Sequence, residues 1–155
     1  IKRDKWFDAG NRKVVVRITM PDLEGVSVSG SGRVTVNDPL KGGDLDISIS
    51  GSGKAFLRDV TLSDVECNIS GSGSLNIAGD GTIERLEMNI SGSGDYVGEA
   101  TRVGTLEANI SGSGSCDCHV TGMLRASISG SGHINYSGNP KIDAAISGSG
   151  KVRMK

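Results

Sequence analysis

Acidic residues that recur at a nearly constant interval are the chain's first candidates for chemistry. Asp46, Glu66, Glu87 and Glu107 each stand four residues before a Ser-Gly-Ser-Gly sequence, and their spacings are 20, 21 and 20 residues. Clustered carboxylates can hold a hard cation such as Ca²⁺. Two carboxylates that face each other across a cleft can hydrolyse a glycosidic bond. These four residues are therefore the candidate ligand-binding or cation-binding residues.

The same spacing has a simpler interpretation, in which the carboxylates form a solvated face. On a flat strand face, the six to eight oxygen ligands of a Ca²⁺ ion are difficult to assemble. Glu66 and Glu87 would be neighbours on that face, whereas glycoside hydrolysis needs opposed carboxylates. We therefore predict no catalytic residue and expect Lys41 and Arg85 to interleave as counter-charges. A weak cation site is the alternative.

The segment CDCH at 116–119 is a second candidate, because thiolates and imidazole are zinc ligands. Its two cysteines, however, occupy positions at which other copies of a repeat carry valine, leucine or isoleucine. A free cysteine packs as a small hydrophobic residue, so we expect both cysteines in the core, and Cys67 likewise. His119 and His133, the only histidines, stand beside turns without an acid–base partner nearby in sequence. We therefore predict no metal ion and no cofactor.

These residues belong to an internal repeat that extends to the last residues of the chain. The sequence SGSG occurs seven times, at intervals of 21, 20, 21, 20, 18 and 18 residues. Its first serines are Ser29, Ser50, Ser70, Ser91, Ser111, Ser129 and Ser147. Repetition at about 20 residues is typical of solenoid proteins, in which each repeat forms one turn of a coil.

Apolar and polar residues alternate on both sides of each SGSG sequence. The first, third and fifth positions before it are apolar in nearly every copy, as in Ile49, Ile47 and Leu45. The alternation resumes after it, as in Leu75 and Ile77. A period of two predicts strands with one buried face, and no segment shows the 3.6-residue period of a helix.

Identical residues can stack on one another only if successive copies run in the same direction. We therefore predict an all-β fold, a right-handed parallel β-helix of about seven rungs with 18–21 residues each. The segments that close each turn vary in length, and several carry one further apolar residue, for example Val60, Ile83 and Val103. This extra residue predicts a short third side of the coil.

The small residues of SGSG suit a corner that must bend in the same way in every rung. Glycine adopts positive φ without a steric penalty and lets neighbouring rungs approach each other closely. Serine hydroxyls both donate and accept hydrogen bonds, so we expect serine ladders along the coil. A phosphate-binding loop is the alternative, but such a loop normally occurs once and precedes a helix. The repetition favours the structural interpretation.

The length of the chain indicates a single domain. The 155 residues carry a formal net charge of -1. Residues 1–17 are basic, yet they have too few aromatic residues for us to expect a nucleic-acid partner. No run approaches the roughly 20 apolar residues of a transmembrane helix.

We divide the domain 1–155 into two regions. Residues 1–24 form an N-terminal strand and cap region, in which VVVRITM lies against the first rungs. Residues 25–155 form the SGSG repeats.

The repeated [IV]SGSG corners, the LxxxISGSG arms and the ending YSGNPKIDAAISGSGKVRMK resemble the DUF2807 family of auto-transporter adhesin, head GIN domains, common in Bacteroidetes. The resemblance runs from KWFDAGNRKVVVRITMPDL to Lys155. It implies a right-handed parallel β-helix in an exported protein of the cell envelope, outer membrane or surface. Family members carry a segment upstream, which we expect to be missing here. The resemblance supplies no catalytic residue.

Two function hypotheses from different classes follow. The first is a non-enzymatic surface or envelope module, an adhesin-like or scaffolding β-helix that binds an unknown protein or glycan. The second is a carbohydrate-binding or carbohydrate-cleaving β-helix protein. Because the open end of a coil exposes unpaired strand groups, we also expect self-association into a homo-oligomer through an end or a face of the coil.

Overall fold

The computed structural model describes residues 23–155. In these residues the chain folds into twelve strands, and the segment contains no helix, hence none that could cross a membrane. The strands are β1 (Gly25–Gly30), β2 (Arg33–Val36), β3 (Leu40–Gly51), β4 (Lys54–Arg58), β5 (Val60–Gly71), β6 (Ser74–Ala78), β7 (Thr82–Gly92), β8 (Asp95–Gly112), β9 (Ser115–Gly130), β10 (His133–Ser137), β11 (Lys141–Gly148) and β12 (Lys151–Met154). The strand expected at 14–20 lies outside the described residues.

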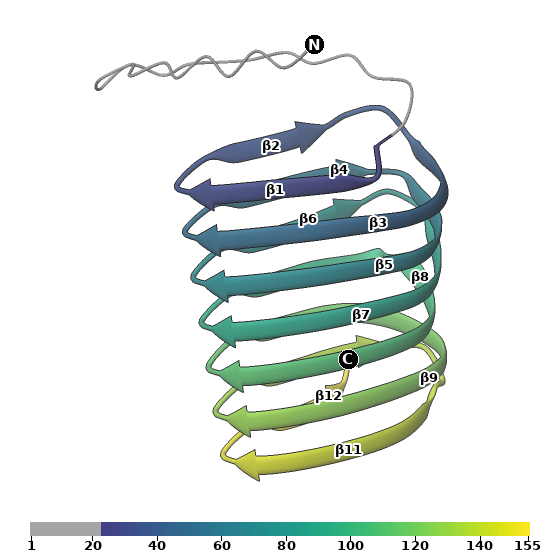
Figure 1. The fold of residues 1–155 in the computed structure, drawn as a ribbon. Coiled ribbons are helices and arrows are strands. Elements are labelled where there is room, and N and C mark those ends of the chain that lie inside the picture. Colours follow the sequence, from purple (N-terminus) through teal and green to yellow (C-terminus); the bar gives the residue numbers. More distant parts are fainter. Residues whose placement is uncertain (1–22) are drawn as a thin grey trace.

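The strands form the two walls of a coil (Figure 1). The front wall has the order β1-β3-β5-β7-β8-β9-β11, and the back wall has the order β2-β4-β6-β8-β9-β10-β12. All pairings are parallel. The chain runs leftward along the front wall and returns rightward behind it while descending, so the coil is right-handed. The predicted β-helix is confirmed, with about six full turns between the first strand and the last.

The inward columns predicted from the alternation form one continuous core. Ile49, Ile69 and Ile90 stack in register on the front wall, and each is 1% exposed. On the back wall, the buried Tyr96 stacks on Cys116. The hydroxyl of Tyr96 occupies the space beside Gly98, where an added Cβ atom would collide with it. The glycine at that inward position therefore makes room for the tyrosine.

The short third side is also confirmed. Val60, Ile83, Val103 and Val120 are all fully buried where each turn closes. The segments that close the turns vary in length, and irregular loops could therefore be expected on this side. Instead, β8 and β9 continue around it as unbroken strands and so belong to both walls. In β8, three extra residues, 99–101, are accommodated as an irregularity in the pairing with β9.

The two glycines of each SGSG corner are constrained by backbone conformation and by the neighbouring rung. The first has a positive φ in every copy, between 82° at Gly30 and 126° at Gly112. The second sits against the preceding rung. A Cβ atom at Gly114 would lie 2.6 Å from the Cγ2 atom of Ile90 and 2.6 Å from the carbonyl oxygen of Gly94. Close approach between rungs thus requires the second glycine and, from Gly51 on, the first as well, since a Cβ atom at Gly112 would collide with the carbonyl oxygen of Gly92. Backbone conformation is a further requirement at the first glycine alone.

The predicted ladder of serine hydroxyls is wrong. Between residues 23 and 155, the corner serines form no side-chain hydrogen bonds with one another. The backbone joins the rungs instead. The amide of Ser72 donates to the carbonyl of Gly51 at 2.8 Å, and the amide of Ser93 donates to that of Gly71 at 2.8 Å. Since these backbone bonds already hold the corner together, the serine hydroxyls remain directed toward solvent.

The last rung has a partner on one side only. β11 pairs with β9 and β12 pairs with β10, and no further described strand follows them. Two side chains of the inward column, Ile142 and Ile146, are therefore 46% and 44% exposed. The β11–β12 end of the coil presents apolar side chains next to free backbone groups.

Candidate functional site

The four candidate carboxylates do stack as the repeat predicted. Asp46 lies in register with Glu66, Glu66 with Glu87, and Glu87 with Glu107 on the front wall. All four side chains are exposed. Rungs of a parallel coil are about 4.8 Å apart, so the column places like charges side by side on one flat face. The carboxylates are neighbours and do not oppose one another across a cleft.

An asparagine ladder runs beside this acidic column and donates hydrogen bonds to its carboxylates. The Nδ2 group of Asn89 donates to Oδ1 of Asn68 at 3.1 Å, and that of Asn109 donates to Oδ1 of Asn89 at 3.1 Å. The ladder also reaches the carboxylates, because Asn68 Nδ2 donates to Oε1 of Glu66 at 2.8 Å. The three asparagines share one outward column of the repeat. That signal was present in the sequence, but its role as a ladder was not predicted.

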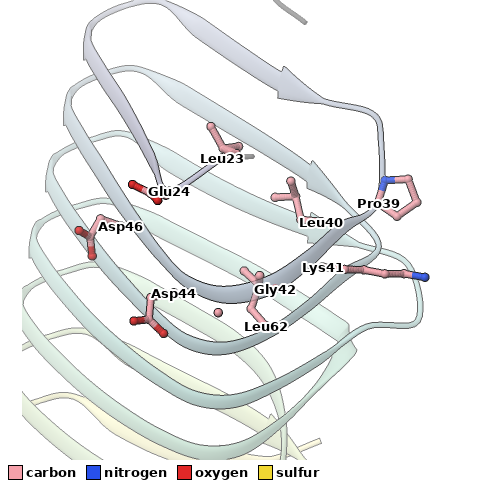
Figure 2. A pocket seen from close by; sticks show the side chains of 10 residues that line it. Leu23, Glu24, Pro39, Leu40, Lys41, Gly42, Asp44, Asp46 and Leu62 are labelled. Carbon is pink, nitrogen blue, oxygen red and sulfur yellow. The ribbon is translucent and has the colours of Figure 1, made fainter. Parts of the chain in front are cut away.

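The expected counter-charges lie elsewhere. The Nη1 atom of Arg85 is 3.6 Å from Oδ1 of Asp64, in the outward column next to the four carboxylates. Lys41 points away from the coil (Figure 2), and it forms no salt bridge with a carboxylate of the described chain. In the part of the chain from Leu23 onward, no three His, Cys, Asp or Glu side chains are placed to hold a metal ion. The weak cation site therefore rests on the stacking alone.

The cysteines lie in the core, as their column positions predicted. Cys67, Cys116 and Cys118 are free and at most 1% exposed. Burial raises the pKa of the Cys67 thiol to about 12. A hydrogen bond with Cys118, and then burial, raise the pKa of Cys116. Burial likewise raises the pKa of Tyr96, whose hydroxyl is buried without a hydrogen-bond partner in the described residues. Neutral thiols packed among aliphatic side chains are poor metal ligands and poor nucleophiles.

The two histidines are separate from one another and from the acidic column. The Nδ1 atom of His119 is 3.0 Å from the hydroxyl oxygen of Ser137 in the next rung, and the ring is half-buried. His133 begins β10 and is exposed. Neither histidine has a carboxylate among its described side-chain hydrogen-bond partners, so no acid–base pair forms around them.

A hollow of about 500 Å³ opens beside the first described turns (Figure 2). Leu23, Leu40 and Leu62 form its apolar part, and Glu24, Asp44 and Asp46 form an acidic rim. Leu23 and Leu40 point into the space between the two walls. Of the four candidate carboxylates, only Asp46 contributes to this hollow. It combines an apolar floor with negative charge and contains no pair of residues that suggests catalysis.

A smaller hollow of about 330 Å³ lies on the outer surface of the back wall. Six outward side chains from β2, β4 and β6 line it: Arg33, Thr35, Lys54, Phe56, Ser74 and Asn76. The sequence did not predict this site, because each of these residues looks ordinary in its own repeat. Only the register between strands brings the six together.

Comparison with known proteins agrees with the fold. The family whose model matches residues 1–140 is DUF2807, described as "Putative auto-transporter adhesin, head GIN domain". No curated protein matches the chain. Three solved structures do, and the chain spans little more than half the length of each.

The first of these structures is described as a "Putative lipid binding protein" from Parabacteroides distasonis. It is 34% identical, and the match covers 84% of this chain and 52% of that one with a TM-score of 0.81. The second, a "putative adhesin" from the same species, is 28% identical over 86% of this chain and 56% of that one, with a TM-score of 0.83. A "putative adhesin" from Parabacteroides merdae is 26% identical over 86% and 57%, with a TM-score of 0.80.

Proposed function

The chain belongs to the DUF2807 family, and we propose from this membership and its surface geometry that it is a non-enzymatic binding module exported to the cell envelope or cell surface. In this role the β-helix is an adhesin-like or scaffolding rod that presents its outer walls to a protein or glycan. The observation that carries the proposal is the unbroken register of outward side chains. On the front wall this register places a carboxylate at four successive rungs, from Asp46 to Glu107, before Arg125 follows Glu107.

A rigid surface with a regular repeat supports binding more than catalysis. A parallel coil does not change shape when an extended ligand lies along it, so little conformational entropy is lost on binding. Catalysis by two carboxylates needs groups on opposite sides of a substrate. The acidic side chains here lie side by side on one wall, which supports a non-enzymatic role.

The test is a binding screen combined with activity assays on the folded chain. We expect saturable binding to at least one member of an array of glycans and surface proteins, and no release of reducing ends from polysaccharides. Binding to no member of the array would contradict the proposed role. Turnover that is lost in Glu66→Gln or Glu87→Gln would instead establish the carbohydrate-cleaving alternative.

Amphiphile binding is a second candidate, favoured by the leucine-lined hollow of Figure 2. The structural neighbour described as a putative lipid binding protein supports it. A fluorescent fatty acid should then bind the chain, and Leu62→Asp should abolish that binding. Failure of the fatty acid to bind would remove this candidate and leave the surface-binding role unaffected.

We also propose that the β11–β12 end pairs with a second copy of the chain. The inward side chains of β11 are symmetric about Ala144, which has an isoleucine two residues away on each side, Ile142 and Ile146. Antiparallel pairing of two β11 strands about Ala144 places Ile142 of one copy opposite Ile146 of the other. In that register Lys141 faces Ser147 and Asp143 faces Ala145, so no like charges meet. The exposed isoleucines of both copies would thereby be covered.

A further inference from the structure

The hollow on the back wall is a compact grid of three rungs and two columns. In the first column Arg33 lies in register with Lys54, and Lys54 with Ser74. In the second, Thr35 lies in register with Phe56, and Phe56 with Asn76. Neighbours within a column are about 4.8 Å apart. The six side chains therefore gather basic, aromatic and hydrogen-bonding groups within the area of one small ligand.

The positive charges of this grid have no counter-charge in the described structure. Arg33 and Lys54 stand side by side and are exposed, and neither forms a salt bridge with a carboxylate of residues 23–155. The first acid along their column is Asp95, beyond Ser74. Farther along the back wall, by contrast, the Nζ atom of Lys155 is 2.9 Å from Oδ1 of Asp117. An anionic group bound at Arg33 and Lys54 would relieve the repulsion between them.

Phe56 provides the apolar surface of the grid. It is the only aromatic residue on an outward column of the described chain, since Tyr96 and Tyr136 occupy inward columns. Its ring is half-buried and lies among the other lining groups. An aromatic face provides a large, rigid apolar contact, and Thr35 and Asn76 on either side offer hydrogen bonds. The volume of about 330 Å³ is at the small end of ligand sites, which span about 300–1,000 Å³.

We infer that this hollow binds one acidic sugar unit of an anionic glycan. This inference rests on the proposed surface-binding function and names the class of ligand. The sugar ring lies against Phe56, its carboxylate or sulfate group accepts hydrogen bonds from Arg33 and Lys54, and its hydroxyls meet Thr35 and Asn76. The hollow is open along the outer wall, so a polymer can continue beyond the bound unit in both directions.

The experiment uses titration calorimetry with the folded chain and defined oligosaccharides. Oligogalacturonate supplies carboxylates and a sulfated dextran oligosaccharide supplies sulfates, while methyl-esterified galacturonate and unsulfated dextran of the same length are the neutral partners. We expect at least one acidic form to bind about tenfold or more tightly than its neutral partner, as the loss of a charge-assisted hydrogen bond predicts. Which acidic form binds identifies the charged group.

Two variants and a matched control locate the site. Lys54→Ala and Phe56→Ala should each weaken binding of the acidic sugar about tenfold. Arg125→Ala removes an exposed charge of the same sign from the front wall and should leave binding unchanged. Far-ultraviolet circular dichroism and melting curves check that each variant is folded.

Three results would overturn the inference while leaving the surface-binding role intact. The first is glycan binding that is as tight for the neutral forms, and the second is binding that Lys54→Ala and Arg125→Ala reduce equally. The third is binding of an oligonucleotide that is as tight as the sugar and insensitive to Phe56→Ala, which would indicate a site for polyanions in general. Failure of every array ligand to bind would instead contradict the proposed function itself.

Discussion

At the scale of single residues, the corner shows that one glycine of a pair can be needed for two reasons and the other for only one. Gly112 adopts a φ of 126° that side chains disfavour and also lies against the Gly92 carbonyl, whereas Gly114 is constrained only by its contact with the preceding rung. The pattern SGSG predicted a corner and positive φ. It also predicted close approach between rungs, but not which atoms meet, because the contact between Gly114 and Ile90 joins residues of different rungs.

We predict that Gly114→Ala destabilises the fold by about 1–3 kcal/mol, the usual effect of overpacking a well-packed interior. The added methyl group would meet the Ile90 side chain and the Gly94 carbonyl, and the backbone carbonyl has little freedom to move. Gly43→Ala is the matched control, because an added Cβ atom there meets nothing within 4 Å. Urea unfolding of both variants measures the difference. Equal midpoints would show that the rungs are less tightly packed than described.

The buried thiols predict how stability depends on pH. The thiol of Cys67 has an ordinary pKa of 9.0 when exposed and a pKa of about 12 in the fold. The unfolded chain therefore loses this proton first, so the free energy of unfolding is highest below pH 9 and falls as pH rises toward 12. Each such group contributes a slope of up to about 1.4 kcal/mol per pH unit.

Cys67→Ala should make that decrease less steep. Val65→Ala creates space on the same strand without removing a titrating group, so it should keep the steepness of the unaltered chain. Chemical unfolding of the two variants between pH 8 and pH 11 provides the comparison. A slope that Cys67→Ala leaves unchanged would contradict the assigned pKa.

At the scale of strands and columns, the order of the chain was largely predictable, because each column repeats one residue type at nearly equal intervals. The repeat located the corners, the inward columns and the parallel pairing. Interactions between side chains of different rungs were harder to predict. The corner serines were expected to form a ladder, yet the ladder is formed by Asn68, Asn89 and Asn109. Both sets stack, and only the longer asparagine amides reach the next rung.

Replacing the central asparagine tests the role of this ladder. Asn89→Ala removes the hydrogen bonds to both Asn68 and Asn109, and we expect a loss of about 1 kcal/mol in the free energy of unfolding. Ser127→Ala lies in the same outward column next to Asn109 and should be nearly neutral. Thermal melts at low and high salt give a second readout. Salt should reduce the destabilisation, because it screens the neighbouring carboxylates, and equal loss at both salt concentrations would argue against a role of the ladder in relieving their repulsion.

At the scale of the whole molecule, the two walls differ in the charged side chains they present, and β11 and β12 pair with described strands on one side only. The front wall carries the acidic column, and the back wall carries the basic pair Arg33 and Lys54 next to Phe56. Sequence analysis found the acidic column because it repeats. It missed the grid on the back wall because that combination of residues occurs only once, and alignment of the repeats reveals only features that recur.

The self-association proposed for the last rung has a direct test. We expect the chain to form a dimer whose population rises with concentration in light scattering, and Ile146→Lys to shift it to the monomer. Lysine places like charges in the apolar contact and suits an exposed strand edge. Arg125→Ala on the same wall should leave the dimer unchanged. A monomer at every concentration, or a dimer that persists in Ile146→Lys, would contradict pairing through β11.

Because all corners have the sequence SGSG, the number of turns in the coil can change without altering the structure of a corner. Excision of residues 51–70 would join Ser50 to Gly71 and recreate an intact SGSG corner, with every remaining inward residue still in its column. The rod can thus be shortened or lengthened by whole turns without a new junction. Gene duplication or unequal recombination within the repeat would change how far the module reaches while keeping the chemistry of its walls.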